Sequence, residues 1–134
     1  MTNNTVLSQV QSLQQLGRVT YGLVPIAAGA DKFTNLLTHW SNYVSPGLQT
    51  LLPLSADTFM MIVGVVEIVA GLFVLSIPRI GAWIVAAWLL IIACTLVLSG
   101  TYLDVAVRDI VMALGAYVLA RLTGILESKK AQLN

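Results

Sequence analysis

The chain has 134 residues, of which 57% are apolar and only 10% carry a charge, and its formal net charge is +1. Soluble domains carry charge on about a quarter of their residues, so this composition and a mean hydropathy of +0.86 exclude an ordinary soluble domain. The small net charge gives no reason to expect a nucleic-acid partner. We therefore expect one all-α domain over residues 1–134, an integral membrane four-helix bundle embedded in a lipid bilayer.

The first predicted span covers residues 16–33 and is the least apolar of the four, because charged residues interrupt both of its ends. Long basic side chains near helix ends reach the membrane interfaces, which lets this segment cross a bilayer. One stripe of the helix collects its charged, small and helix-breaking residues: Arg18, Gly22, Pro25, Gly29 and Lys32. We expect this stripe to face other helices, with residues 3–16 forming an interfacial extension.

The connection to the second span is the longest in the chain. Over residues 33–44 apolar side chains recur at helical spacing among Thr, Asn and Ser, which predicts a short amphipathic helix lying in the membrane interface. Trp40 and Tyr43 would anchor it at the lipid headgroups. Pro46 and Gly47 would end it.

The second predicted span, residues 57–77, contains a single internal charge, Glu67. A carboxylate at the bilayer centre costs about 2.5–3.5 kcal/mol on insertion scales, so Glu67 should face a protein interior or a polar cavity. Gly64 and Gly71 lie on the same helix face and allow another backbone to approach closely. Ser55 is the predicted N-cap of this helix.

The third predicted span, residues 80–100, carries no charge and forms a helical hairpin with the second span through the turn at Pro78 and Arg79. The fourth covers residues 105–125. Its inward face is predicted to begin at Asp109 and to continue with three alanines. The faces of the first, second and fourth spans would then meet in one bundle core.

Four spans place the N-terminus, the turn at Pro78 and Arg79 and the C-terminus on one side of the membrane. That side collects five basic residues against two on the other side, which favours cytoplasmic termini in a bacterial inner membrane. Residues 1–17 contain neither Lys nor Arg and no long apolar run, so we expect no cleaved signal peptide.

The candidate site is an intramembrane polar cluster of five side chains: Glu67, Arg108, Asp109, Lys32 and Arg18. Arg108 is the first choice of partner for Glu67, because a guanidinium keeps its charge and can bind a carboxylate through two hydrogen bonds, and Lys32 is the second. The cluster either bridges helices or lines a small pocket for a proton, a quinone headgroup or a partner subunit. The sequence leaves both alternatives open.

Several chemistries are excluded by residue counts. Cys94 is the only cysteine, which excludes paired-cysteine chemistry within this chain, and we expect it to pack inside the third span. His39 is the only histidine, which excludes a zinc site or a bis-histidine haem built from this chain alone. No phosphate-binding loop or nucleophile–base pair is recognisable. We therefore predict no catalytic residues, no metal, no cofactor and no self-sufficient enzyme.

The order and spacing of four short motifs along the chain are informative together: Arg18-Val-Thr-Tyr-Gly22, Gly29-Ala-Asp-Lys32-Phe33, Glu67-Ile-Val-Ala-Gly71 and Val107-Arg108-Asp109-Ile110. On these motifs the chain resembles the DoxX-like family of small four-helix bacterial membrane proteins, over residues 16–123. The resemblance implies a four-helix membrane bundle associated with quinone-linked sulfur oxidation, terminal oxidase assemblies, or thiol and oxidative-stress complexes. It implies no shared catalytic residues, and the single cysteine argues against a direct thiol role.

Three functions follow as hypotheses. The first is a non-catalytic accessory subunit that packs against other membrane subunits of a larger redox or respiratory assembly. The second is a small transporter or proton relay in which Glu67 is the titrating group. The third is a quinone-interacting oxidoreductase subunit in which Glu67, Tyr21 and Trp88 border the headgroup.

Overall fold

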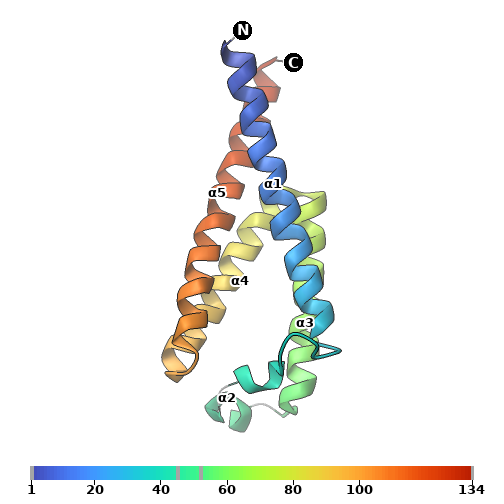
Figure 1. Cartoon of the computed structure of the whole chain (residues 1–134), viewed down its shortest axis with the longest axis vertical. Coiled ribbons are helices and arrows are strands. Elements are labelled where there is room, and N and C mark those ends of the chain that lie inside the picture. The colour runs from blue at the N-terminus through green and yellow to red at the C-terminus, as the bar shows by residue number, and fades with distance from the viewer. Residues whose placement is uncertain (1, 45, 52, 134) are drawn as a thin grey trace.

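The computed structural model describes residues 2–44, 46–51 and 53–133, which form helices and connecting turns without a strand (Figure 1). The α-helices are α1 (Thr2–Asp31), α2 (Pro46–Leu51), α3 (Ala56–Ser76), α4 (Pro78–Ser99) and α5 (Leu103–Leu133). One 3₁₀ helix, η1 (Trp40–Tyr43), lies between α1 and α2. The predicted all-α class is confirmed.

Three of the described helices are long and apolar enough to cross a membrane. They are α3, α4 and α5, whose most apolar stretches have mean hydropathies of 2.4, 2.5 and 1.6. They cover the second, third and fourth predicted spans, and α5 continues beyond the predicted end to Leu133. Residues 16–31 of the first predicted span lie within α1, which is more polar because it includes Arg18, Asp31 and several glutamines. The lengths and compositions of these helices indicate a membrane protein.

The long helices are arranged as two antiparallel pairs (Figure 1). α1 lies along α3, and α4 lies along α5. The pairs converge near the connection between α3 and α4 and diverge toward the end that carries η1 and α2. The core at the convergence consists of small and branched side chains: Ala70, Val74, Ala82, Val85, Ala86, Ala116, Leu119 and Ala120.

Glycines bring the backbones of α1 and α3 together. A Cβ atom on Gly64 would lie 2.6 Å from the carbonyl oxygen of Gly29, and a Cβ atom on Gly71 would lie 2.5 Å from the carbonyl oxygen of Gly22. Real Cβ atoms do not approach a backbone this closely, so any other residue at Gly64 or Gly71 would push the two helices apart. The structure thus places the four glycines singled out in the sequence at one helix–helix contact.

The connection between α3 and α4 consists of Ile77 alone. Pro78 occupies the first position of α4, where its missing N–H leaves no helical hydrogen bond unmade. Arg18 stabilises the end of α3, because its Nε atom donates to the carbonyl oxygen of Leu75 at 2.9 Å. At the other end of α3, Ser55 is the N-cap as predicted, and its hydroxyl oxygen accepts a hydrogen bond from the Thr58 backbone amide.

The N-terminal part of α1 and the C-terminal part of α5 extend together past the α3–α4 connection (Figure 1). Gln14 on α1 donates from Nε2 to the Thr123 hydroxyl on α5 at 3.1 Å, and both side chains are buried. Residues 3–16 were predicted to form an interfacial extension of the first helix. These residues do continue the first helix, as part of α1, and Gln14 among them contacts α5; their place at the membrane interface stays a prediction.

The predicted amphipathic helix over residues 33–44 is wrong. The chain there forms turns and the single 3₁₀ helix η1, and it folds back over Asp31. The Asp31 carboxylate accepts four hydrogen bonds, from the backbone amides of Leu36 and Leu37, the Thr34 hydroxyl and the Trp40 indole, at 2.8–3.0 Å. A buried carboxylate therefore satisfies amides that a helix would otherwise have paired.

This fold-back also sets the contacts of Trp40 and Tyr43, the two predicted headgroup anchors. Trp40 donates its indole N–H to Asp31, and the Tyr43 ring packs against Trp40 and against Tyr102 on the segment before α5, with ring centroids 5.9 and 4.4 Å apart. Both aromatic rings line a cavity between the helices, and their role as headgroup anchors stays a prediction. The most exposed large apolar side chains on this loop are Leu36 and Leu37, at 84% and 74%.

Candidate ligand-binding cavity

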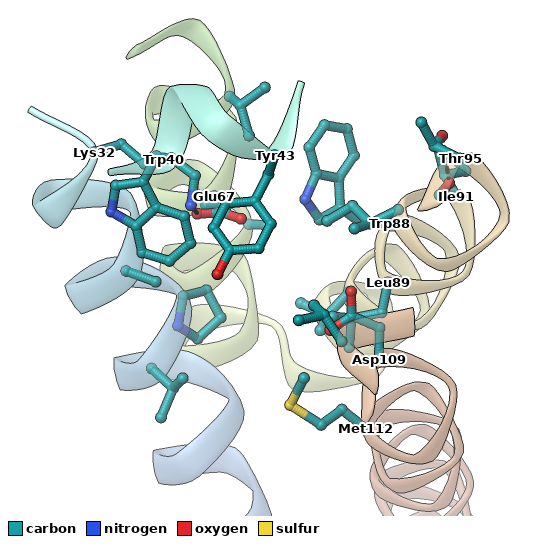
Figure 2. Close-up of a pocket in the computed structure, with 18 of the residues that line it drawn as sticks. Lys32, Trp40, Tyr43, Glu67, Trp88, Leu89, Ile91, Thr95, Asp109 and Met112 are labelled. Carbon is teal, nitrogen blue, oxygen red and sulfur yellow. Dashed lines mark hydrogen bonds and ion pairs between the residues drawn. The ribbon is translucent and has the colours of Figure 1, made fainter. Parts of the chain in front are cut away.

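A cavity of about 600 Å³ lies between the two helix pairs where they diverge (Figure 2). α1, η1, α3, α4 and α5 all contribute to its walls, which are predominantly apolar. Ala70 and Val85 belong both to the cavity wall and to the buried core, so the core closes the cavity toward the α3–α4 connection. Small-molecule sites in proteins typically measure about 300–1,000 Å³, and this cavity falls in that range.

Lys32 and Glu67 form the strongest polar contact in the cavity. The Lys32 Nζ atom lies 2.6 Å from Glu67 Oε2, and the two side chains are only 3% and 13% exposed. Nζ also lies 3.8 Å from the centroid of a Trp40 ring, a cation–π contact (Figure 2). Burial removes both charges from water at a cost in free energy, and their mutual attraction offsets that cost. Either charge buried alone would lack this compensation.

Arg108 was predicted to be the first-choice partner of Glu67, and this is wrong. Its Nη2 atom lies 3.8 Å from Asp104 Oδ2 one turn earlier on α5, and both side chains are largely exposed. Arg108 and Asp109 are adjacent on a helix, so they point about 100° apart. Asp109 faces inward, and Arg108 is left at the edge of the cavity.

Asp109 is a buried carboxylate on the α5 wall, and its residue is only 6% exposed. It forms no hydrogen bond or ion pair with any other residue in the described part of the chain. It lies close enough to Glu67 and Lys32 to interact with both electrostatically. Buried polar groups usually have hydrogen-bond partners, so an unpaired carboxylate here indicates a place for water or a ligand.

Trp88 on α4 contributes a second unpaired polar atom. Its indole Nε1 is buried and has no acceptor among residues 2–44, 46–51 and 53–133. The indole lies on the opposite side of the cavity from Lys32 and Trp40 (Figure 2). Buried indole N–H groups normally find an acceptor, so this donor is left unsatisfied beside the cavity that Trp88 lines.

The remaining residues singled out in the sequence lie at the edge of the cavity or outside it. Tyr21 lines the cavity and bridges the two helix pairs, because its hydroxyl donates to the carbonyl oxygen of Met112 at 2.8 Å. Arg18 lies outside, at the end of α3. Cys94, predicted to pack inside, is exposed on α4. The structure therefore brings together Lys32, Glu67 and Asp109 and separates them from Arg18.

Sequence reasoning missed the part that the loop after α1 plays in this site. Asp31 holds Trp40 in place over Lys32, and neither contact follows from helical periodicity. The available signal was an aspartate directly before Lys32 at a helix end, followed by Thr34 and Asn35, a composition typical of side-chain-capped turns. Among the described residues no group of three or more His, Cys, Asp or Glu side chains is placed to hold a metal ion.

The chain was compared with known protein families, curated proteins and solved structures, and none of them matches it. The DoxX-like resemblance therefore stays a prediction from four short motifs.

Proposed function

We propose that this protein binds a small, mainly apolar molecule with a hydrogen-bonding headgroup, of the quinone type, as a non-catalytic subunit of a larger membrane redox assembly. The observation that carries the proposal is the cavity of about 600 Å³, whose apolar walls hold an ion pair and two unpaired polar groups. Apolar walls with a few well-placed polar groups are characteristic of sites for small organic ligands.

The polar groups of the cavity suit a ring that carries carbonyl oxygens. Trp88 lines one wall, and its Nε1 has no acceptor among the described residues. Lys32 on the other wall donates one N–H to Glu67. An ammonium group has three donors, so two remain. A quinone carries acceptors on opposite edges of its ring, and its apolar substituents fit the remaining walls. The DoxX-like resemblance, which implies quinone-linked chemistry, supports the same choice.

A closed inner end favours binding over transport. Ala70 and Val85 are 3% and 4% exposed and join the cavity to the buried core. A proton relay or transporter that uses Glu67 needs a path to both membrane faces. The packed core beyond Ala70 and Val85 supports a ligand site over such a path, so we favour binding.

We also propose that α1 is a fourth membrane span. Its Gly22 and Gly29 contact Gly71 and Gly64 in the middle of α3, so this part of α1 lies at the same depth as an apolar span. Its Leu16 and Leu23, which do not line the cavity, are more than half exposed, as expected of lipid-facing residues. For such a four-span bundle in a bacterial inner membrane, the distribution of basic residues supports cytoplasmic termini.

The test is a thermal-shift titration of the detergent-purified chain with decylubiquinone, a short-chain benzoquinone. A ligand that binds only the folded state stabilises it by about 2.7 kcal/mol at 100 times its Kd. Ala28→Leu places a larger side chain on the cavity wall, and Ala27→Leu places the same side chain on the exposed face one residue away. We expect the wild type and Ala27→Leu to be stabilised equally and Ala28→Leu to lose the effect.

The hydrogen bond from Trp88 is tested in the same assay. Trp88→Phe keeps an aromatic ring and removes only the donor, so the affinity should fall about threefold to tenfold. Trp83→Phe, on a tryptophan outside the cavity, should bind like the wild type. Equal stabilisation of all variants would mean that the quinone acts through the detergent, and the proposed site would be wrong.

A further inference from the structure

A second hollow lies between α4 and α5, near the connection to α3 and away from the ligand cavity. Its volume is about 350 Å³, and its charged and hydroxyl-bearing lining comes from Arg79, Arg121, Ser128 and Lys129. We call it the basic groove. None of its lining residues lines the ligand cavity, so an inference about the groove does not depend on the proposed ligand site.

The groove carries more positive charge than its neighbours neutralise. One acidic side chain lies against it, since Glu127 Oε2 is 3.3 Å from Arg79 Nη1, and both of those side chains are at least half exposed. Exposed ion pairs of this kind contribute little. Arg121 and Lys129 form no ion pair with any described residue. Two cations are therefore free to neutralise an anion.

The floor of the groove is open and one of its guanidinium groups is held in position. A Cβ atom on Gly124 would meet only Arg79 Nε, at 3.8 Å, so the space above this glycine is free. Arg121 Nη1 donates to the Tyr117 hydroxyl at 2.9 Å. Since a guanidinium has five N–H donors, Arg121 keeps others for an anion after making this bond.

Aromatic side chains place the groove at the level of the lipid headgroups. The Trp83 and Tyr117 rings meet edge to face, with centroids 5.4 Å apart and an interplanar angle of 74°, and they are 48% and 39% exposed. Trp and Tyr are enriched where a membrane span meets the headgroup region. Arg79 is the second residue of α4, so it also lies at the end of an apolar span.

We infer that the basic groove binds the phosphate headgroup of an anionic phospholipid such as phosphatidylglycerol. Arg79, Arg121 and Lys129 supply the charge, and Ser128 supplies a hydroxyl donor. Basic pockets between membrane helices on the cytoplasmic side are the kind of site in which such headgroups bind. The phosphate would sit over Gly124, with its acyl chains along the lipid-facing surfaces of α4 and α5, where Ile80 and Ile84 are exposed.

The test measures lipid retention by native mass spectrometry of the full chain in a neutral detergent, titrated with phosphatidylglycerol or phosphatidylcholine. We expect the wild type to retain phosphatidylglycerol preferentially. Arg121→Gln and Lys129→Gln should each weaken that retention about fivefold. Lys130→Gln removes the same charge one residue outside the groove and should change nothing. Gly124→Leu fills the groove without a charge change and should also abolish the preference.

Three results would overturn the inference. One is an equal loss in Lys130→Gln and Lys129→Gln, which would mean general attraction to a basic helix end. Another is full retention in Gly124→Leu, which would place the lipid elsewhere. The third is displacement of the lipid by inorganic phosphate at equal concentration, which would identify a soluble anion as the ligand. Circular dichroism checks that each variant is folded, and Gly124→Leu and Lys129→Gln keep the test decisive if Arg121→Gln fails to fold.

Discussion

Lys32 Nζ lies 2.6 Å from Glu67 Oε2, and this ion pair joins the end of α1 to the middle of α3 inside the protein. Each charge compensates the burial of the other, so removing one partner leaves the second buried and unpaired. We expect Glu67→Gln to lower the free energy of unfolding by about 3 kcal/mol. The change in the free energy of unfolding is measured by unfolding the detergent-solubilised protein with sodium dodecyl sulfate.

The matched variant is Lys32→Met combined with Glu67→Gln, which removes both charges together. It should be more stable than Glu67→Gln alone, and the double-mutant cycle gives the coupling of the pair. Additive effects of the two substitutions would show that the pair is not coupled, and the structural role assigned to it would have to be abandoned.

Two cavity tryptophans are expected to respond to the same substitution with opposite signs. Trp88 Nε1 is buried without an acceptor, so Trp88→Phe removes an unsatisfied donor and should stabilise the ligand-free protein by about 1 kcal/mol. Trp40 Nε1 donates to Asp31 at 2.8 Å, so Trp40→Phe should destabilise it by about 2 kcal/mol. Melting curves of protein stripped of small molecules measure both. Destabilisation by both substitutions to the same extent would contradict the unpaired state of Trp88.

Asp31 accepts two hydrogen bonds on each carboxylate oxygen: Thr34 and Leu36 on Oδ1, Leu37 and Trp40 on Oδ2. Asp31→Asn turns one oxygen into a donor and so leaves two of these donors without an acceptor. We expect the loop to open and amide exchange at Leu36 or Leu37 to accelerate at least tenfold, which corresponds to about 1.4 kcal/mol.

Hydrogen exchange with mass spectrometric detection, read on peptides that cover residues 34–44, measures this opening. The control is Asp104→Asn, since Asp104 is 68% exposed and its one ion pair within the described part of the chain is with the exposed Arg108. Unchanged exchange in Asp31→Asn would show that the carboxylate does not hold the loop.

The glycine contact between α1 and α3 makes a steric prediction. An alanine at Gly64 would place its Cβ atom 2.6 Å from the Gly29 carbonyl oxygen, so Gly64→Ala should destabilise the protein by about 2 kcal/mol. The control is Gly47→Ala, because a Cβ atom there meets nothing within 4 Å. Equal stability of the two variants would mean that the helices separate at no cost.

The sequence was most informative where a local rule acts alone. Composition sets the all-α membrane class, Ser55 marks the start of α3, and Pro78 marks the start of α4. These features depend on neighbouring residues only. The spacing of Gly64, Glu67 and Gly71 also identified the face of α3 that turns toward α1, because small residues permit close packing.

Prediction failed where the outcome depends on how helices are rotated or on contacts of a single side chain. Arg108 and Asp109 are neighbours, and only the rotation of α5 decides that Asp109 faces the cavity. The apolar spacing of residues 33–44 suggested a helix, but four donors instead converge on Asp31. Periodicity counts apolar residues and contains no information about a buried acceptor nearby.

The single residue Ile77 between α3 and α4 is a short joint between two arms, the α1–α3 pair and the α4–α5 pair. Gly81 allows α4 to begin in direct contact with the backbone of α3 at Phe73 and Val74, so the two arms cannot part at this point. Any spreading of the arms grows with distance from the joint, so it widens the gap beside Trp88 more than the gap beside Ala70. An occupant of the kind proposed would therefore be held chiefly at the far end, where Asp31 holds the loop.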